Sequence, residues 1–140
     1  MMISTRGRYA IRVIVDLAEQ CSSKYVRLKD LSERQGVSIK YLENIMALLS
    51  KHGMVDAVHG KGGGYKLTKD PSEYKVGDFL RLTEGTLAPV SCLECGGPDC
   101  PKKTNCRTLP MWKKLDKMIN DYFDSITIAD LMRTEDGMWI

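Results

Sequence analysis

The chain has 140 residues, of which 43% are hydrophobic and 28% charged, as is typical of a soluble domain built on one apolar core. No apolar run approaches the roughly 20 residues that span a bilayer, and the N-terminus has no apolar signal segment, so we expect a cytoplasmic protein with no membrane partner. The net charge of +3 is uneven: residues 1–69 hold 12 Lys and Arg against 6 Asp and Glu, whereas residues 70–140 hold 9 against 12. A basic first half favours a polyanionic partner, although a solvated surface of mixed charge has the same composition.

Three helices are predicted in the first third of the chain. Apolar residues recur at helical spacing over residues 5–20, and arginines lie near the start of this segment. A short helix over residues 26–36 ends at a glycine, and Ser38 is a good N-cap for a longer helix that runs to about Lys51. Two helices joined by a tight turn that contains glycine form the helix-turn-helix pattern.

The apolar spacing changes after these helices. Residues 55–58 and 65–67 read as two short strands, and the six residues between them include four glycines. Glycines allow the positive backbone angles of a tight hairpin tip. A hairpin that directly follows a helix-turn-helix is a wing. A phosphate-binding loop is the rival interpretation, but no Gly-Lys-Ser or Gly-Lys-Thr opens a helix here.

Candidate DNA contacts follow from this arrangement. A recognition helix reads base edges with its N-terminal residues, and nearby cations hold the phosphates. Glu43 can accept from a cytosine amino group and Asn44 can pair with adenine, although Glu43 also fits a plain solvent-facing position. The wing tip is narrow enough to enter a minor groove. The candidate DNA-binding residues are Arg6, Arg8, Ser38, Lys40, Tyr41, Glu43, Asn44, His59, Gly60 and Lys61.

A further short helix is predicted over residues 74–82, ended by Glu84 and Gly85, and an irregular loop follows over residues 86–107. Four of the five cysteines lie in this loop, with the spacing C-x2-C-x4-C-x5-C: Cys92, Cys95, Cys100 and Cys106. Disulfides are unfavoured in a reducing compartment. Four interpretations remain open: an iron–sulfur cluster, which we favour; a zinc site; a thiol redox switch; or thiols without a role.

The last third of the chain is predicted to be helical and to dimerise. Within a helix over residues 110–126, apolar side chains step by 3, 4, 3 and 4 residues: Trp112, Leu115, Ile119, Tyr122 and Ile126. Such a heptad seam favours a homodimer, and packing on the chain's own domain is the alternative. A capping box over residues 127–130 predicts one more short helix. With two histidines and no catalytic arrangement, we expect no enzyme.

Several motifs together resemble the Rrf-type family of bacterial winged helix-turn-helix transcription regulators. The motifs are Ile3-Ser-Thr-Arg-Gly-Arg-Tyr9, Tyr41-Leu-Glu43, Val58-His-Gly-Lys-Gly-Gly-Gly-Tyr65, Leu82-Thr-Glu-Gly85, and Cys100-x5-Cys106 followed by Trp112. The resemblance implies a homodimer that binds a palindromic double-stranded DNA operator, with the long helix crossing to the partner subunit. It also implies that Cys92, Cys100 and Cys106 lie in the cluster-ligand region of the iron–sulfur members.

The chain departs from that family pattern at the fourth ligand. Leu109 stands where the iron–sulfur regulator has a ligating histidine, and Arg8 replaces the acidic ligand of the nitric-oxide sensor. Cys95 is an additional thiol, which either takes this role or competes with Cys92 for one ligand position, so a two-iron and a four-iron cluster both remain open. The wing arginine that is common in the family is replaced by His59.

We therefore expect a mainly α fold with a small β-hairpin wing: a winged helix-turn-helix DNA-binding domain over residues 1–85, a cysteine-rich sensor loop over 86–107, and a dimerisation helix and tail over 108–140. The expected function is a homodimeric repressor whose DNA binding is modulated by an iron–sulfur cluster in the 92–106 loop, zinc being the less favoured metal. One alternative is a cysteine-metabolism repressor that works with cysteine synthase through the Met138-Trp139-Ile140 tail, because the tail resembles that branch of the family. The others are a cluster-free thiol redox sensor and a small electron-transfer protein.

Overall fold

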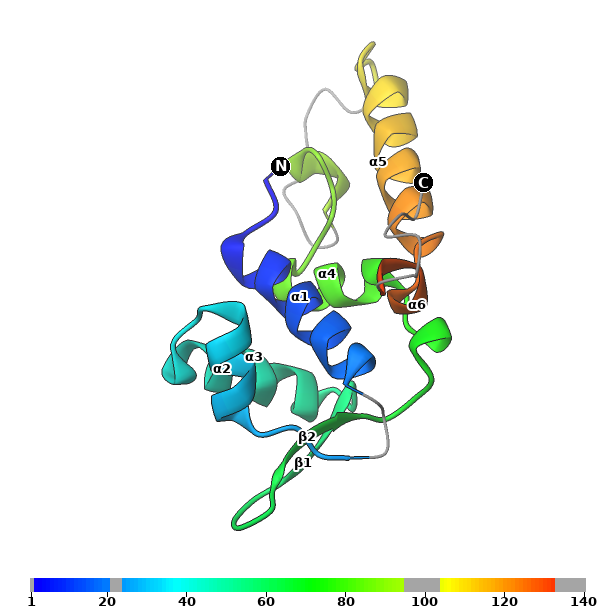
Figure 1. Ribbon diagram of the computed structural model, residues 1–140. Coiled ribbons are helices and arrows are strands. Elements are labelled where there is room, and N and C mark those ends of the chain that lie inside the picture. The colour runs from blue at the N-terminus through cyan, green and yellow to red at the C-terminus, as the bar shows by residue number, and fades with distance from the viewer. Residues whose placement is uncertain (1, 21–23, 95–103, 133–140) are drawn as a thin grey trace.

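A computed structural model describes residues 2–20, 24–94 and 104–132 of the chain. Figure 1 shows a cluster of short helices above a β-hairpin, with one long helix rising beside it. The elements in chain order are α1 (Thr5–Glu19), α2 (Leu28–Gln35), α3 (Ile39–Lys51), β1 (Val55–Val58), β2 (Gly64–Leu67), α4 (Val76–Glu84), α5 (Leu109–Asp124) and α6 (Ile128–Leu131), with single 3-10 turns at Pro71–Glu73 and Ser91–Leu93. Within the described residues, no helix is long and apolar enough to cross a bilayer. The mainly α fold with a small hairpin is confirmed.

The helix-turn-helix forms where the cap and turn residues predict it. Helix α2 ends at Gly36, whose φ of 64° lies in the left-handed region that glycine adopts without strain. Helix α3 begins after Ser38, whose Oγ accepts a hydrogen bond of 3.1 Å from the backbone N–H of Tyr41. These two signals fix the angle and the starting residue of the second helix.

Helix α1 supplies the centre of the core. Its apolar side chains, including Val13, Ile14 and Leu17, are buried, and it contacts α2, α3, α4, α6 and β2. Asp16 is buried on the same helix, and its carboxylate accepts from Arg34 (Nη2 to Oδ1, 2.7 Å) and Gln35 (Nε2 to Oδ2, 2.7 Å) of α2. A buried carboxylate needs such partners, so this cluster joins α1 to α2 in one orientation.

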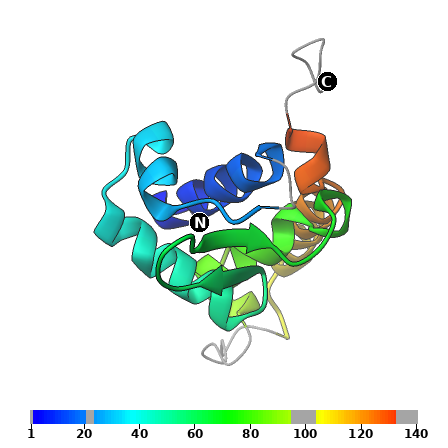
Figure 2. The ribbon, with the colours of Figure 1, turned by 60° about the horizontal axis from the view of Figure 1, so that its bottom comes forward.

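The wing is a two-stranded antiparallel hairpin, with Val55 opposite Leu67 and Val58 opposite Gly64. Figure 2 shows it in front of α1, with α2 and α3 beside it. Val26 and Tyr65 exchange two backbone hydrogen bonds of 2.8 Å, which form an isolated β-bridge at the edge of the hairpin. At Gly64 any Cβ would lie 2.3 Å from the carbonyl oxygen of Val26, so only glycine permits this approach. The glycine run therefore forms the turn and also allows the wing to pack on the preceding chain.

Three predicted helix boundaries are wrong because distant residues pair. Helix α2 starts at Leu28 and not at residue 26, since Val26 pairs with Tyr65. The other two boundaries share one reason. Tyr74 and Lys75 do not belong to α4, because this segment pairs with residues 126–128: the N–H of Val76 donates to Ile126 O (2.9 Å) and the N–H of Ile128 donates to Tyr74 O (3.0 Å). Helix α4 consequently starts at Val76, and α5 ends at Asp124 rather than at residue 126. Ile126 lies outside the helix and is only 8% exposed, so it belongs to the core and not to a dimer seam.

The last short helix is confirmed. Thr127 and Asp130 form the predicted capping box, with the Thr127 Oγ accepting from the Asp130 N–H and the Asp130 carboxylate accepting from the Thr127 N–H. Helix α6 then packs on α1. The segment that follows α5 therefore packs on the winged domain.

Candidate nucleic-acid interface and cysteine loop

The first turns of α3 present the predicted base-reading residues to solvent. Lys40, Glu43 and Asn44 are exposed, whereas Ser38 uses its hydroxyl as the helix cap. Tyr41 is half-buried, and its ring meets the ring of Tyr9 edge-on with the centroids 6.0 Å apart. Three of the five predicted α3 residues are therefore available to a ligand, and the other two position the helix.

The start of α1 brings cations next to the start of α3. Because Tyr9 packs on Tyr41, the first two turns of α1 lie against the first turn of the recognition helix. Arg6 and Arg8 are exposed there, and Arg8 donates from Nη2 to Thr5 Oγ1 over 3.1 Å. Both arginines project from a rigid helix near the same edge of the domain.

Arg12 is held by the protein itself. Its guanidinium lies 4.8 Å from the centroid of the Tyr9 ring, and its Nε donates to Gln35 Oε1 over 3.1 Å. Arg12 therefore links α1 to α2 and holds the Tyr9 ring, whereas Arg6 and Arg8 are exposed to solvent.

The wing tip and α3 enclose an open cleft. The predicted wing residues His59, Gly60 and Lys61 are exposed, and His59 and Gly60 line the cleft together with Glu43 of α3. Glu43 and Tyr65 of the wing line the same cleft. Burial raises the pKa of the Tyr65 phenol, and the nearby Glu43 carboxylate raises it further. The structure thus brings the wing and recognition-helix candidates to the two sides of one cleft.

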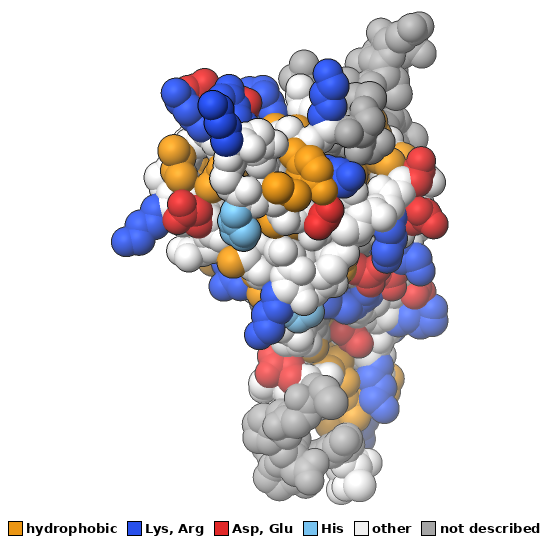
Figure 3. Space-filling view, turned by 90° about the horizontal axis from the view of Figure 1, so that it is seen from below, with side chains coloured by type: hydrophobic (Ala, Val, Ile, Leu, Met, Phe, Trp, Pro, Cys, Tyr) orange, Lys and Arg blue, Asp and Glu red, His pale blue; other side chains and the backbone are white. Residues whose placement is uncertain are grey.

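Arg27, which sequence reasoning did not select, also lines this cleft. It precedes α2, is largely exposed and pairs with Asp30 over 3.2 Å. Only the contact between Val26 and Tyr65 brings it beside the wing, so no local sequence signal identifies it. Figure 3 shows that Lys and Arg side chains project around this side of the molecule with Asp and Glu among them, so its charge is mixed.

The C-terminal end of α4 holds the start of α1. The Glu84 Oε1 accepts from the Ser4 backbone N–H (3.0 Å) and from the Ser4 Oγ–H (2.6 Å), while Ser4 caps α1. A Cβ at Gly7 would lie 2.3 Å from the same oxygen, so a larger residue at this position would displace the Glu84 carboxylate from Ser4. A carboxylate at a helix N-terminus is favourable, because it faces the positive end of the helix dipole. Two motifs that are about 80 residues apart in the sequence therefore form one contact.

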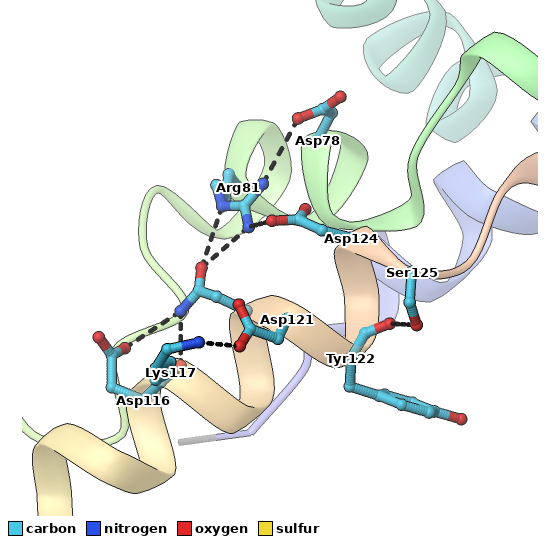
Figure 4. Close-up of polar contacts among 9 residues, drawn as sticks. Asp78, Arg81, Asp116, Lys117, Asp121, Tyr122, Asp124 and Ser125 are labelled. Carbon is cyan, nitrogen blue, oxygen red and sulfur yellow. Dashed lines mark hydrogen bonds and ion pairs between the residues drawn. The ribbon is translucent and has the colours of Figure 1, made fainter.

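Arg81 of α4 holds the long helix α5. Its guanidinium donates to Asn120 Oδ1 (2.9 Å from Nη2) and to Asp124 Oδ2 (2.8 Å), and Asp78 lies 3.4 Å away on its own helix (Figure 4). The hydrogen bond from Arg81 lowers the pKa of Asp124. The other oxygen, Asp124 Oδ1, has no hydrogen-bond partner among the described residues and lies where a Cβ at Gly77 would come within 2.2 Å.

The cysteine loop joins these two helices. Cys92 lies in the 3-10 turn that follows α4, and Cys106 lies three residues before α5, with its Sγ 3.4 Å from Thr108 Oγ1. Both side chains are half-buried. Cys95 and Cys100 lie outside the described residues, as does the C-terminal tail over residues 133–140. Residues 2–20, 24–94 and 104–132 contain no group of three His, Cys, Asp or Glu that could hold a metal.

The exposed apolar stripe on α5 differs from the predicted seam. Ile119 packs against the core of its own domain, and Trp112 is half-buried. The large apolar side chains exposed on the helix step by 4, 3 and 4 residues: Met111, Leu115, Met118 and Tyr122. The exposed stripe keeps the heptad spacing, but Met111 and Met118 take the places of the predicted Trp112 and Ile119.

Three comparisons place this geometry among known proteins. The Rrf2 family, described as an iron-dependent transcriptional regulator, matches residues 3–134. The HTH-type transcriptional regulator IscR of Vibrio campbellii is 35% identical over 140 residues, which cover 100% of this chain and 82% of that protein. These names agree with the expectation of a regulator and not an enzyme.

The solved structures that resemble the chain are also winged-helix regulators. CymR, the global cysteine regulator of B. subtilis, matches with a TM-score of 0.75 and 30% identity, covering 94% of this chain and 95% of that one. IscR of T. potens matches with a TM-score of 0.70 and 37% identity, covering 94% and 85%. The likeness extends over the winged domain and the long helix together.

The lowered pKa of Asp124 predicts an acid-dependent loss of stability. Asp124 has a lower pKa in the folded than in the unfolded protein, so its charged form stabilises the fold. This stabilisation is complete above the ordinary carboxyl pKa of about 4. It is lost as the pH falls through the lower pKa of the folded protein. Asp124→Asn should lower the free energy of unfolding by about 0.5 to 1 kcal/mol at pH 7, because the pair is partly exposed. Urea denaturation at pH 7 and pH 3 measures this, and the difference from the wild-type protein should shrink at pH 3.

Asp121→Asn is the matched control. Asp121 forms an exposed pair with Lys117 on the same helix, so its removal should change the unfolding free energy less at either pH. An Asp124→Asn effect that is equal at both pH values would show that the contact with Arg81 does not depend on the carboxylate charge.

Proposed function

Because the chain belongs to the Rrf2 family of transcriptional regulators, we propose that it is a homodimeric repressor whose DNA binding is modulated by an iron–sulfur cluster in the 92–106 cysteine loop. The observation that carries the proposal is the position of this loop. It connects α4, which holds the start of α1, to α5, which presents an exposed apolar stripe. A cytoplasmic location is part of the proposal.

The DNA contacts of the proposal divide into base and phosphate contacts. Lys40, Glu43 and Asn44 lie on the exposed face of α3, where side chains of a recognition helix meet base edges in the major groove. Arg6, Arg8 and Lys61 are exposed cations at the edges of the same surface and would contact phosphates. Tyr41 and Ser38 orient the recognition helix, through the Tyr9 contact and the cap.

The wing would enter the adjacent minor groove. His59, Gly60 and Lys61 form its exposed tip, and the positive φ angles at Gly60 (91°) and Gly62 (78°) keep that tip narrow. The cleft between the wing and α3 leaves room for the sugar-phosphate backbone between the two grooves. Arg27 lines this cleft and adds a further cation.

The donor set of the cysteine loop fits an iron–sulfur cluster. Clusters of this kind are held by thiolates, and four thiols occur within residues 92–106. Cys92, Cys100 and Cys106 would be ligands, with Cys95 as the fourth, because neither Leu109 nor Arg8 is a suitable donor. When bound, the cluster supplies a redox-sensitive cross-link between the two ends of the loop, in a two-iron or four-iron form. Zinc is the second choice, since only one C-x2-C pair is present.

The path from the loop to the DNA-binding surface runs through α4. Arg81 holds α5, and Glu84, three residues later on the same helix, holds Ser4 at the start of α1. A change in the loop that displaces the start of α5 would act on Arg81, and a tilt of α4 would move α1 and the Tyr9–Tyr41 contact with it. The recognition helices of a dimer would then change their separation.

Dimerisation would occur through the exposed stripe of α5. Met111, Leu115, Met118 and Tyr122 form a seam at heptad spacing, and an unpaired seam of this kind is satisfied by the same seam of a second copy. Two winged domains in one dimer match the symmetry of a palindromic operator.

A second candidate function is a cysteine-metabolism repressor that works with cysteine synthase through the Met138-Trp139-Ile140 tail. The likeness to the global cysteine regulator of B. subtilis favours it. A free carboxylate on an apolar terminal residue is a group that a small pocket can capture. Under this alternative, or that of a thiol redox sensor, the purified protein would hold no cluster.

Salt dependence tests the DNA contacts. The protein should bind a duplex selected from random sequences, with an affinity that falls steeply as salt rises. Lys61→Ala and Arg8→Ala should each reduce the slope of log affinity against log salt by about 1, since each removes one phosphate contact. Fluorescence anisotropy measures the slope. Lys117→Ala, an exposed lysine of α5, should leave it unchanged, and an unchanged slope in the wing variant would contradict the placement of the wing.

Metal analysis tests the cluster. Protein reconstituted with iron and sulfide under anaerobic conditions should absorb visible light and hold stoichiometric iron. Cys92→Ser and Cys106→Ser should each lose most of the iron, because each removes a thiolate from one end of the loop. Cys21→Ser is the matched control, since this cysteine lies outside the loop, and it should retain iron. A colourless wild-type protein without iron after reconstitution would refute the cluster, and bound zinc would replace it.

Light scattering tests the dimer seam. Met118→Glu places a charge in the centre of the stripe, where Met118 is 59% exposed in the single chain, and should yield a folded monomer at about 10 µM because a charge without a partner is not buried in an interface. Lys113→Glu, at an exposed position of the same helix outside the stripe, should stay dimeric. A dimeric Met118→Glu variant would place the interface elsewhere.

A further inference from the structure

An apolar side chain is exposed at the start of the recognition helix. Ile39 is the first residue of α3 and is 44% exposed, whereas Leu42, Ile45 and Leu49 of the same helix are buried. Ile39 lies at the edge of the buried stripe, just beyond its N-terminal end. Burial of an isoleucine in the core is favourable by about 1.5 to 3 kcal/mol, so the fold alone gives no reason for a large apolar residue here.

The surroundings of Ile39 are those of a base-reading position. Ser38, directly before it, uses its hydroxyl to cap the helix, and Lys40, directly after it, is exposed. Glu43 follows one turn later, so the two side chains are neighbours on one face of the helix, and Glu43 lines the cleft beside the wing. Ile39 therefore lies on the surface that the proposed function turns toward the major groove.

The chemistry of the major groove offers one apolar group. Among the base edges there, the four base pairs differ in their donors and acceptors, and the 5-methyl group of thymine is the apolar feature. An isoleucine cannot hydrogen-bond to any of the polar edges, and placing it against them would leave them without partners. The group that it complements is therefore a thymine methyl.

We infer that Ile39 contacts the 5-methyl group of a thymine and thereby selects thymine at one position in each half of the operator. This inference rests on the proposed function and names a specificity residue that the hydrogen-bonding candidates of α3 do not include. Glu43, one turn along, would contact the neighbouring part of the same half-site. Lys40 and Asn44 lie on the same exposed side and would contribute the polar contacts.

Replacing thymine by deoxyuridine tests the inference, because it removes the methyl group and leaves base pairing and phosphates unchanged. An operator is first selected from random duplexes with the full-length protein, and its thymines are then replaced one symmetric pair at a time. Burial of one methyl group contributes about a factor of four in affinity. At one symmetric pair of thymines, the affinity of the wild-type protein should therefore fall about fourfold for each half-site, or roughly 15-fold for the two together.

The Ile39→Ala variant should bind the thymine and deoxyuridine operators equally well, whereas Ile39→Val should retain most of the preference. Val58→Ala is the matched control: Val58 is an apolar residue of the wing that is 43% exposed, and its loss should leave the thymine preference intact. Far-ultraviolet circular dichroism checks that each variant is folded, as the exposure of Ile39 predicts.

The possible results distinguish the role of Ile39 from the proposed function. If the wild-type protein binds its operator but no deoxyuridine replacement weakens binding, or if Ile39→Ala keeps the preference, the role of Ile39 is refuted and the proposed function stands. If the protein selects no duplex in either the reconstituted or the cluster-free form, the proposed function is refuted and the role of Ile39 with it.

Discussion

The hydrogen bonds from Arg81 to Asn120 and Asp124 are the contact on which the functional architecture depends. The core of the winged domain would form without them, because it is built on the apolar face of α1. The long helix, by contrast, projects from that domain (Figure 1). Its large apolar side chains Met111, Leu115, Met118 and Tyr122 are exposed. Arg81 and the nearby packing of Ile119 and Phe123 give α5 a defined direction. A helix with a defined direction can transmit a displacement, whereas a loosely attached one cannot.

The short helix α4 makes one polar contact with α5 and another with the N-terminus of α1. Arg81 faces α5, and Glu84 faces the N-terminus of α1, where Gly7 makes room for its carboxylate. Both contacts use charged groups that are only partly buried, so each is of moderate strength and can be rearranged. The cysteine loop begins just after this helix and ends just before α5. In the proposed mechanism, a change in the loop therefore acts on the two helices that it joins.

Local signals predicted the winged part of the fold, and long-range pairing explains where they failed. Ser38 and Gly36 gave the start and the turn of the recognition helix because caps and left-handed glycines act within a few residues. The start of α4 and the end of α5 were misplaced because residues 74–76 pair with residues 126–128, and no local pattern reports such a pairing. The contact of Arg81 with Asp124 spans 43 positions and gave no signal either. The predicted seam differs from the exposed stripe on α5 because Ile119 and Met118 are both apolar, and packing on the winged domain distinguishes them.

In the proposed mechanism, the state of the cysteine loop sets the affinity of the DNA-binding surface through α4. The most direct measurement is the operator affinity of the reconstituted and the cluster-free protein under anaerobic conditions, in the wild-type chain and in Arg81→Ala. Coupling between two sites of one protein typically changes affinity by about 5-fold to 150-fold, and we expect the wild-type protein to show a difference in this range that Arg81→Ala largely removes. Equal affinities of the two wild-type forms would contradict the account, and a difference that persists in Arg81→Ala would show that the signal takes another path.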